Sequence, residues 1–217
     1  MGEAIDLTPN KNVSDMRMYG HHPSVTTVLK VMERPFFADW RKKVGEETAD
    51  EKMHNAQVLG TAIHKIAENI ARGRPMELPP EMEPHAQAIQ AFMDKHVAEV
   101  LGTELELVSD TRGFGGTADL YCKLKSGSLA VVDYKSTLSL TRTHGVQLAG
   151  YAFLLTDNGF PVQKRMAVRI KKEEGAAGKY YARNYPDHQE DVDVFLSALV
   201  LWNWENRGKL KKLAEAL

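Results

Sequence analysis

The sequence predicts an α/β protein in which helices flank a central mixed β-sheet and an N-terminal helical region precedes that sheet. Two observations predict this fold. Helical patterns occupy the chain up to about residue 101, and strand patterns then follow in the order β-β-β-α-β-β-α. No stretch rich in Pro, Gly or Ser divides the chain, so we expect one domain over residues 1–217. Within it we expect a flexible arm at 1–22, a helical region at 23–101 and the α/β core at 102–217.

The helical region contains three helical patterns. Ser24 is a suitable N-cap for a short helix, and Pro35 should interrupt that helix because proline lacks the amide proton that a helix interior needs. A long amphipathic pattern covers residues 46–72 and ends at Gly73. After a loop, a further helix is expected over residues 83–101.

The core begins with T-E-L-E-L-V-S at residues 103–109, which alternates as a half-buried strand does. A β-hairpin is expected next, with strands near residues 114–124 and 129–135 around the turn Ser126-Gly127-Ser128. A helix, two strands and a long C-terminal helix complete the core; they are expected at 144–157, 161–171, 179–185 and from Asp187 onward.

Composition excludes several classes of protein. The net charge of −1 means that any nucleic-acid surface must be local rather than global. The single cysteine, Cys122, excludes an internal disulfide and a cysteine-ligated iron–sulfur cluster. No apolar run approaches the roughly 20 residues of a membrane helix, and the acidic N-terminus M-G-E-A-I-D has no targeting pattern. We therefore expect a cytoplasmic protein without a membrane partner.

The hairpin is the most informative stretch, because it brings Asp119, Asp133 and Lys135 together. With the turn centred near Ser126, Asp119 lies opposite Asp133, and Lys135 shares their face of the sheet. Facing carboxylates repel unless a cation lies between them, and Mg²⁺ and Mn²⁺ prefer such ligands. A solvated Asp–Lys pair explains the pattern about as well. However, the apolar run at 129–132 indicates a strand buried on both faces, and open α/β sheets place sites at such strand ends.

Other candidate site residues lie on helices. His64 is inside the long helix, where the small Gly60 and Ala62 would let the helix approach the sheet. Glu68 follows one turn later and could support His64 as a ligand. A lone helical histidine is more often a filler of the core or surface, so this interpretation depends on the hairpin site.

Further candidates come from the helix after the hairpin and from the first strand. Gln147 and Tyr151 are four residues apart on that helix, so they project together toward the strand end. Glu104 and Glu106 share one face of the first strand, and we expect Glu106 to be the one that reaches the site. A half-exposed helix face and a solvated strand face are the alternatives.

Residues that could hold a nucleic acid form a weaker set. Basic residues alternate with aromatic ones between residues 30 and 43, a pattern that can combine phosphate contacts with base stacking. A helix with a solvated basic face fits the same pattern. The DNA-binding candidates, including three near the hairpin, are Arg34, Trp40, Arg41, Lys42, Arg112, Ser136 and Thr137.

Four motifs in order resemble those of the PD-(D/E)XK nucleases of the RecB type. They are G-T-A-I-H at 60–64, G-G-T-A-D at 115–119, D-Y-K at 133–135 and Q-L-A-G-Y at 147–151. The segment S-V-T-T-V-L at 24–29 resembles the opening of many small stand-alone exonucleases of this type from mitochondria, phages and bacteria. Because the N-terminus has no mitochondrial signal, a phage or bacterial origin is expected.

The resemblance implies a restriction-endonuclease-like core and a ligand set for Mg²⁺ or Mn²⁺. That set would be His64, Asp119, Asp133 and the backbone carbonyl of Tyr134, with Lys135 catalytic. Gln147 and Tyr151 would support the site and contact the substrate, and Glu106 would take the preceding acidic position of the family.

The activity implied by the resemblance is that of a metal-dependent DNA exonuclease. Single-stranded ends would thread beneath a helical arch formed by residues 24–100. There is no Walker A loop for a helicase motor and no four-cysteine iron–sulfur clamp. The alternatives are a duplex-end or structure-specific endonuclease and a non-catalytic nucleic-acid-binding module, and clustered carboxylates near phosphate disfavour the module. The expected partners are DNA and proteins of recombination or replication.

Overall fold

The computed structural model describes residues 3–4, 17–171 and 178–214, and within them the side chains of residues 3–4, 33–37, 209 and 211–214 are not described. A five-stranded sheet forms the centre, with the strand order β5-β6-β7-β8-β9. The pair β7–β8 is parallel and the other three pairs are antiparallel. The strands are β5 Val97–Ser109, β6 Phe114–Leu124, β7 Leu129–Lys135, β8 Lys164–Ile170 and β9 Tyr180–Asn184. The predicted α/β fold with a mixed sheet is confirmed.

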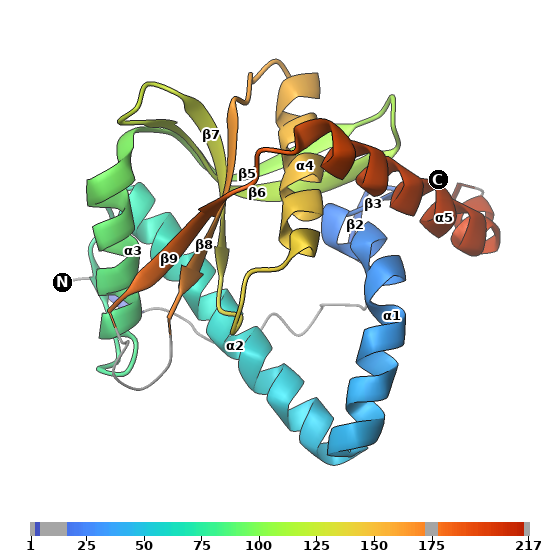
Figure 1. Ribbon diagram of the computed structural model, residues 1–217, viewed down its shortest axis with the longest axis horizontal. Coiled ribbons are helices and arrows are strands. Elements are labelled where there is room, and N and C mark those ends of the chain that lie inside the picture. The colour runs from blue at the N-terminus through green and yellow to red at the C-terminus, as the bar shows by residue number, and fades with distance from the viewer. Residues whose placement is uncertain (1–2, 5–16, 172–177, 215–217) are drawn as a thin grey trace.

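Helices cover both faces of this sheet (Figure 1). Helices α1, α4 and α5 enclose one hydrophobic core, and α2 and α3 enclose the other. Helix α4 is the crossover that a parallel β7–β8 pair requires. Within the described residues, no helix combines the length and the apolar character needed to cross a membrane. The helices are α1 Val25–Val44, α2 Glu46–Ala71, α3 Glu83–His96, α4 Arg142–Asp157 and α5 His188–Ala214.

Helices α1 and α2 meet at Gly45 and form a V that projects from the sheet (Figure 1). Gly45 has φ of 85°, a conformation that favours glycine and allows the sharp change of direction. The predicted break at Pro35 is wrong, because α1 is helical through that position. An interior proline costs about 3 kcal/mol. The buried Val28 on one side and the ion pairs of Arg41 on the other offset part of this cost.

The N-terminal arm is folded where the structure describes it. Strand β1, Glu3–Ala4, pairs with β4, Met76–Glu77, which lies in the expected loop after α2. Strands β2, Met18–Tyr19, and β3, His22–Pro23, form a small hairpin against β6. The Tyr19 ring lies so close to β6 that a Cβ on Gly115 would be 2.7 Å from it. The expectation of a loose arm is therefore corrected for residues 3–4 and 17–22, whereas residues 5–16 lie outside the described residues.

The boundary between the helical region and the sheet also differs from the expectation. The helix expected to reach Leu101 ends at His96, and strand β5 begins directly at Val97. Val97 and Val100 pair with β6 residues, with register irregularities next to each of them. β-branched side chains suit such a strand better than a helix. Long-range pairing with β6 therefore decides the structure of residues 97–101.

Candidate metal centre

Two buried carboxylates lie where strands β6 and β7 separate. The last paired residues of the hairpin are Leu120 and Val132, so Asp119 and Asp133 come next and are opposite in register, as predicted. Asp119 is 6% exposed and Asp133 is 1% exposed. The Asp119 carboxylate accepts a hydrogen bond of 2.8 Å from the backbone N–H of Tyr134. Burial of two carboxylates is costly, so other groups at this site must compensate for it.

Helix α2 brings His64 to these carboxylates. Its Nδ1 atom lies 3.3 Å from Oδ1 of Asp119 and 3.9 Å from Oε1 of Glu104. Earlier in α2, a Cβ on Gly60 would be 3.7 Å from Oγ of Ser136, just after β7. The helix therefore passes close to the end of the strand, as the small residues around His64 indicate.

Strand β5 supplies Glu104 to the cluster rather than Glu106. By the register of β5 and β6, Glu104 lies opposite Asp119, whereas Glu106 pairs with Thr117 and is exposed. Glu104 has φ of 49°, a left-handed conformation uncommon for a residue with a side chain. Simple alternation along the strand cannot predict this local backbone conformation, and it misled the choice between the two glutamates.

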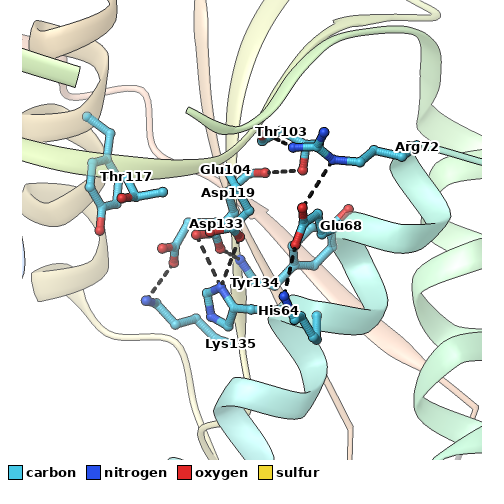
Figure 2. A network of polar contacts seen from close by, with 12 residues as sticks. His64, Glu68, Arg72, Thr103, Glu104, Thr117, Asp119, Asp133, Tyr134 and Lys135 are labelled. Carbon is cyan, nitrogen blue, oxygen red and sulfur yellow. Dashed lines mark hydrogen bonds and ion pairs between the residues drawn. The ribbon is translucent and has the colours of Figure 1, made fainter. Parts of the chain in front are cut away.

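Three potential ligand atoms converge at this point. His64, Glu104 and Asp119 come from α2, β5 and β6, and their ligand atoms all lie within 4.8 Å of one another (Figure 2). One imidazole and two carboxylates are donors that Mg²⁺ or Mn²⁺ accepts. Asp133 lies beside them on β7. The donor set therefore fits a divalent cation.

Residues on the cleft side of Asp133 hold it in place. The Lys135 ammonium is 2.7 Å from Oδ2 of Asp133. From α4, Nε2 of Gln147 donates to Oδ1 of Asp133 at 3.5 Å and to the hydroxyl oxygen of Tyr151 at 3.1 Å. Gly116 leaves room for this tyrosine, since a Cβ there would be 3.0 Å from its ring. The two residues predicted to project together from α4 thus meet each other and Asp133.

The charges of the site depend on one another. Burial raises the pKa of Asp133, and the Asp119 carboxylate adds to the rise although Lys135 opposes it. Burial also acts to raise the pKa of Asp119. The positive charges of His64 and Lys135 outweigh burial, so this pKa lies below its ordinary value. For His64, burial lowers the pKa, while Asp119 and Glu104 raise it to well above its ordinary value. The carboxylates thus favour the protonated form of His64. A divalent cation would compete with this proton for the imidazole nitrogen.

Glu68 lies behind His64 in α2 (Figure 2). Its carboxylate pairs with Arg72 at 3.1 Å and with Lys65 at 3.8 Å. Arg72 in turn donates to the carbonyl oxygen of Thr103 on β5 at 3.5 Å. Glu68 therefore links α2 to β5 beside Glu104, and among the contacts of the described residues it has no direct bond to His64.

Arg41, predicted to bind DNA, is already engaged by acidic residues of α2. Its guanidinium pairs with Glu46 and lies 2.8 Å from Asp50. These ion pairs span the corner between α1 and α2 at Gly45. The structure therefore places Arg41 in the corner of the V, where it fixes the angle between the helices.

The other candidates on α1 lie along the same arm of the V. Lys42 is exposed, and Trp40 is half-buried. The side chain of Arg34 is outside the described residues. These three positions stay predictions of a nucleic-acid contact.

The candidates near the hairpin divide into two groups. Ser136 and Thr137 follow Lys135 directly, and Ser136 lies beside α2 while Thr137 is exposed. Arg112 lies in the β5–β6 turn, with its guanidinium 5.6 Å from the centre of the Phe153 ring. The site aspartate of β6 is five residues beyond Phe114, roughly 16 Å along the strand. Arg112 is therefore near the start of the hairpin strand but away from the site carboxylates, and its contact with DNA stays a prediction.

A cleft of about 850 Å³ opens beside Lys135 and Gln147, between α1 and the start of α4. Its lining is rich in hydroxyl groups and includes an amine and an imidazole, from Thr26, Lys30, Thr137, Ser139, Thr141 and His144. Sequence reasoning missed Thr26, Thr141 and His144 as neighbours of the site. The S-V-T-T motif at 24–27 was the available signal, but its position relative to Lys135 depends on tertiary packing.

A second contact that was missed involves the arm. Arg17 donates to Oγ1 of Thr117 at 3.1 Å, and the Tyr19 hydroxyl also contacts this atom. Thr117 precedes Asp119 by two residues on β6, so the arm packs against the strand that carries a site carboxylate. The double glycine at 115–116 was a signal, because a close neighbour requires the absence of a side chain there.

The chain has only distant similarity to known proteins. No family model matches the chain, and no curated protein matches it. Among solved structures it is similar to an alkaline exonuclease, LHK-Exo, from Laribacter hongkongensis, with 15% identity, a TM-score of 0.41, and coverage of 74% of this chain and 85% of that chain. The structure of LHK-Exo in complex with dAMP gives 15% identity, the same coverages and a TM-score of 0.40. The structure of SSO0001 gives 18% identity, a TM-score of 0.39, and coverages of 82% and 79%. Likenesses this distant carry no conclusion about activity, which must come from the site itself.

Proposed function

We propose that this chain is a metal-dependent deoxyribonuclease of the PD-(D/E)XK type that hydrolyses phosphodiester bonds, with a preference for single-stranded DNA ends. One observation carries the proposal. The potential ligand atoms of His64, Glu104 and Asp119 lie within 4.8 Å of one another, and a buried Asp133–Lys135 pair lies beside them. A binding module gains nothing from carboxylates placed where phosphates would be repelled, whereas a hydrolase needs them to hold a cation.

His64, Glu104, Asp119 and Asp133 are the residues that would hold Mg²⁺ or Mn²⁺. When bound, such an ion lowers the pKa of water and stabilises negative charge that develops on phosphate oxygens. The buried position of the carboxylates strengthens these effects, because the local dielectric constant is lower than in water.

The remaining residues act on the water, the phosphate and each other. Lys135 lines the cleft, where its ammonium can hydrogen-bond the attacking water and balance the charge of the transition state. Water adds to phosphorus, one P–O bond breaks, and the leaving oxygen takes up a proton from solvent. Gln147 and Tyr151 keep Asp133 oriented, since their side chains form a chain of hydrogen bonds to its carboxylate.

Two features support the preference for single-stranded ends. The V of α1 and α2 stands beside the site, and residues of the first turns of α1 line the cleft next to Lys135. The cleft volume of about 850 Å³ is in the range of pockets that enclose a small molecule of nucleotide size. A duplex is too wide for such a pocket, so one strand would enter it.

The test is cleavage of labelled DNA with and without Mg²⁺ or Mn²⁺. Linear single strands, linear duplexes and circular single strands are each incubated with the full chain, with Asp133→Ala and with Lys135→Ala. We expect linear single strands to be degraded only with the metal, and both variants to be inactive. Lys123→Ala is the matched control, because Lys123 is an exposed residue of the same hairpin.

The outcomes separate the alternatives. Cleavage of circular single strands or of internal duplex sites would replace the exonuclease with an endonuclease of the same fold. Binding of DNA without any cleavage under these conditions would indicate a non-catalytic module. Activity that persists in EDTA, or in both variants, would reject the proposed site.

A further inference from the structure

Helix α5 has an apolar face that packs into the molecule. Val192, Phe195, Leu199 and Trp202 are between 1% and 9% exposed, and they recur at spacings of three and four residues. This spacing places them on one side of the helix. The buried side faces α4 and α1, so α5 needs no further apolar residues to hold it in the fold.

The opposite side of α5 is nevertheless apolar at its middle. Val200 is 69% exposed, Trp204 is 65% exposed and Leu201 is 45% exposed. At 100° per residue these three lie on the side of the helix away from the core. A contiguous exposed patch with a tryptophan is typical of a surface that meets another protein.

A groove of about 650 Å³ extends this patch toward the start of α5. One wall is Val31 and Met32 of α1. The other wall is a row of α5 residues with an acidic beginning and an apolar end, Glu190, Asp193, Val194, Ser197, Ala198 and Leu201. Acidic side chains at this end of an apolar groove favour a partner that is apolar and basic.

The sequence of α5 itself has that character at its other end. Residues 207–212 read R-G-K-L-K-K and carry four positive charges, whereas residues 190–193 read E-D-V-D. Asp191 is paired with the buried Arg165, so the outer side of this end has the two negative charges of Glu190, which also contacts the exposed Arg142, and Asp193. One line of positions along α5 has spacings that alternate between four and three residues, as along the contact line of two paired helices. Its positions are 190, 194, 197, 201, 204, 208 and 211. The small Ser197 and Gly208 lie on this line.

We propose that α5 pairs with α5 of a second copy of this chain in antiparallel orientation, which forms a symmetric dimer. When the pair is centred between residues 200 and 201, facing positions add up to 401. Position 190 then faces 211, Ser197 faces Trp204, and Val200 faces Leu201. The acidic start of each helix meets the basic end of the other, and the large tryptophan meets a small residue.

The antiparallel arrangement follows from the charge distribution. A parallel pair would place acidic residues against acidic residues and basic against basic, which is unfavourable. The antiparallel pair also satisfies two-fold symmetry, in which the same surface serves both partners. The overlap from position 190 to 211 is about 32 Å long, at 1.5 Å per residue.

Sedimentation velocity on the full chain over a concentration series tests the apolar centre. We expect a concentration-dependent dimer for the natural chain and a monomer for Leu201→Ser/Trp204→Ser. Phe160→Ser is the matched control, since Phe160 is 42% exposed on the segment after α4 and should leave the dimer intact. Circular dichroism checks that each variant is folded. A natural chain that stays monomeric, or a dimer that survives Leu201→Ser/Trp204→Ser, overturns the proposal.

Charge reversal tests the orientation. Glu190→Lys/Asp193→Lys and Lys211→Glu/Lys212→Glu should each weaken the homodimer at least tenfold. Mixing the two variants should restore dimerisation, because in an antiparallel pair every acidic end then meets a basic end. The weakening of each variant alone is the result that requires pairing of opposite ends of α5, because in a parallel homodimer like charges would face each other both before and after the reversal. Failure of the rescue, or undiminished dimerisation of either variant alone, contradicts the antiparallel dimer even if another partner binds this face.

Discussion

Two buried clusters of charge lie on the same sheet and differ in how their charges are satisfied. The first is centred on Arg165 of β8, which is 3% exposed. Its guanidinium donates to the carboxylate of Asp191 at 3.0 Å and to the carbonyl oxygens of Gly145 and Tyr185 at 2.9 Å each. One cation is matched by one anion, and backbone acceptors take up its other donors. This cluster ties α4 and α5 to the sheet.

The candidate metal centre has a different balance of charge. Three carboxylates, from Glu104, Asp119 and Asp133, face the cations of His64 and Lys135, and the cluster borders a cleft. Without a divalent ion, a histidine that is neutral in its ordinary state carries a proton to offset this surplus of negative charge. In a structural ion pair, protein groups satisfy all the charges and hydrogen bonds. A cluster that binds a charged ligand has unbalanced charge until the ligand is bound. The two clusters should therefore respond in opposite ways to mutation.

The largest expected effect is on activity at the metal centre. Asp119→Asn removes a proposed ligand and one of two neighbouring carboxylates, so we expect cleavage of DNA to fall by about 10³-fold or more. The free energy of unfolding should fall only slightly, because the lost attraction to His64 and Lys135 is partly offset by relief of the repulsion with Asp133. Single-turnover cleavage and urea unfolding measure the two quantities. A variant that unfolds before it loses activity would mean that Asp119 is structural.

The next largest effect is on stability at the Arg165 cluster. Asp191→Asn leaves the guanidinium buried without its anion, which should lower the free energy of unfolding by about 3–5 kcal/mol. Activity per folded molecule should stay within a few-fold of the natural chain, since α5 supplies no group to the centre. Urea unfolding and cleavage at a temperature where the variant is folded provide the measurements. A large loss of activity in folded Asp191→Asn would erase the distinction between the clusters.

Metal binding should stabilise the natural chain by a smaller amount. At a concentration of Mn²⁺ or Mg²⁺ about 100 times the dissociation constant, the gain is about 2.7 kcal/mol. His64→Gln and Glu104→Gln should lose this gain, and Glu106→Gln should keep it, because Glu106 is exposed and outside the cluster. Thermal unfolding with added metal and with EDTA measures the effect. Equal responses of Glu104→Gln and Glu106→Gln would contradict the proposed ligand set.

The fold and the centre of the site were predictable because patterns between residues close in sequence determine them. The turn centred near Ser126 determines the register of the hairpin, so Asp119 and Asp133 fall opposite each other by counting. Alternation in β7 and the spacing of Gln147 and Tyr151 are equally local. These features depend on the periods of strands and helices, which the sequence displays directly.

The parts that were mispredicted depend on tertiary structure. Glu104 replaces Glu106 because of a left-handed residue in β5, and Pro35 stays inside α1, where packing and ion pairs on both sides offset part of its cost. Arg41 has the charge for DNA but is paired with acidic residues that follow Gly45. In each case the deciding partner is set by the packing of other segments, and no local pattern reveals it.

The smallest predicted effect concerns His144, which caps the start of α4 beside the cleft. Its Nδ1 accepts a hydrogen bond of 2.9 Å from the N–H of Thr141. Burial lowers the pKa of His144 to about 4, with Lys135 and Arg183 as the cations that face it from β7 and β9. Between pH 6.5 and 4 the unfolded chain therefore binds a proton that the folded chain does not.

The free energy of unfolding should consequently fall as the pH is lowered from 7 toward 4. The contribution of His144 is on the order of 1 kcal/mol once solvent screening of this partly exposed residue is considered. His144→Gln keeps an acceptor at the cap but cannot titrate, so its stability should depend less on pH in this range. Urea unfolding at pH 5 and 7 compares it with His54→Gln, a change at an exposed position of α2. If His144→Gln loses as much stability on acidification as His54→Gln, the cap histidine is not the group that responds to pH, and the cleft side of α4 has no acid-sensitive capping contact.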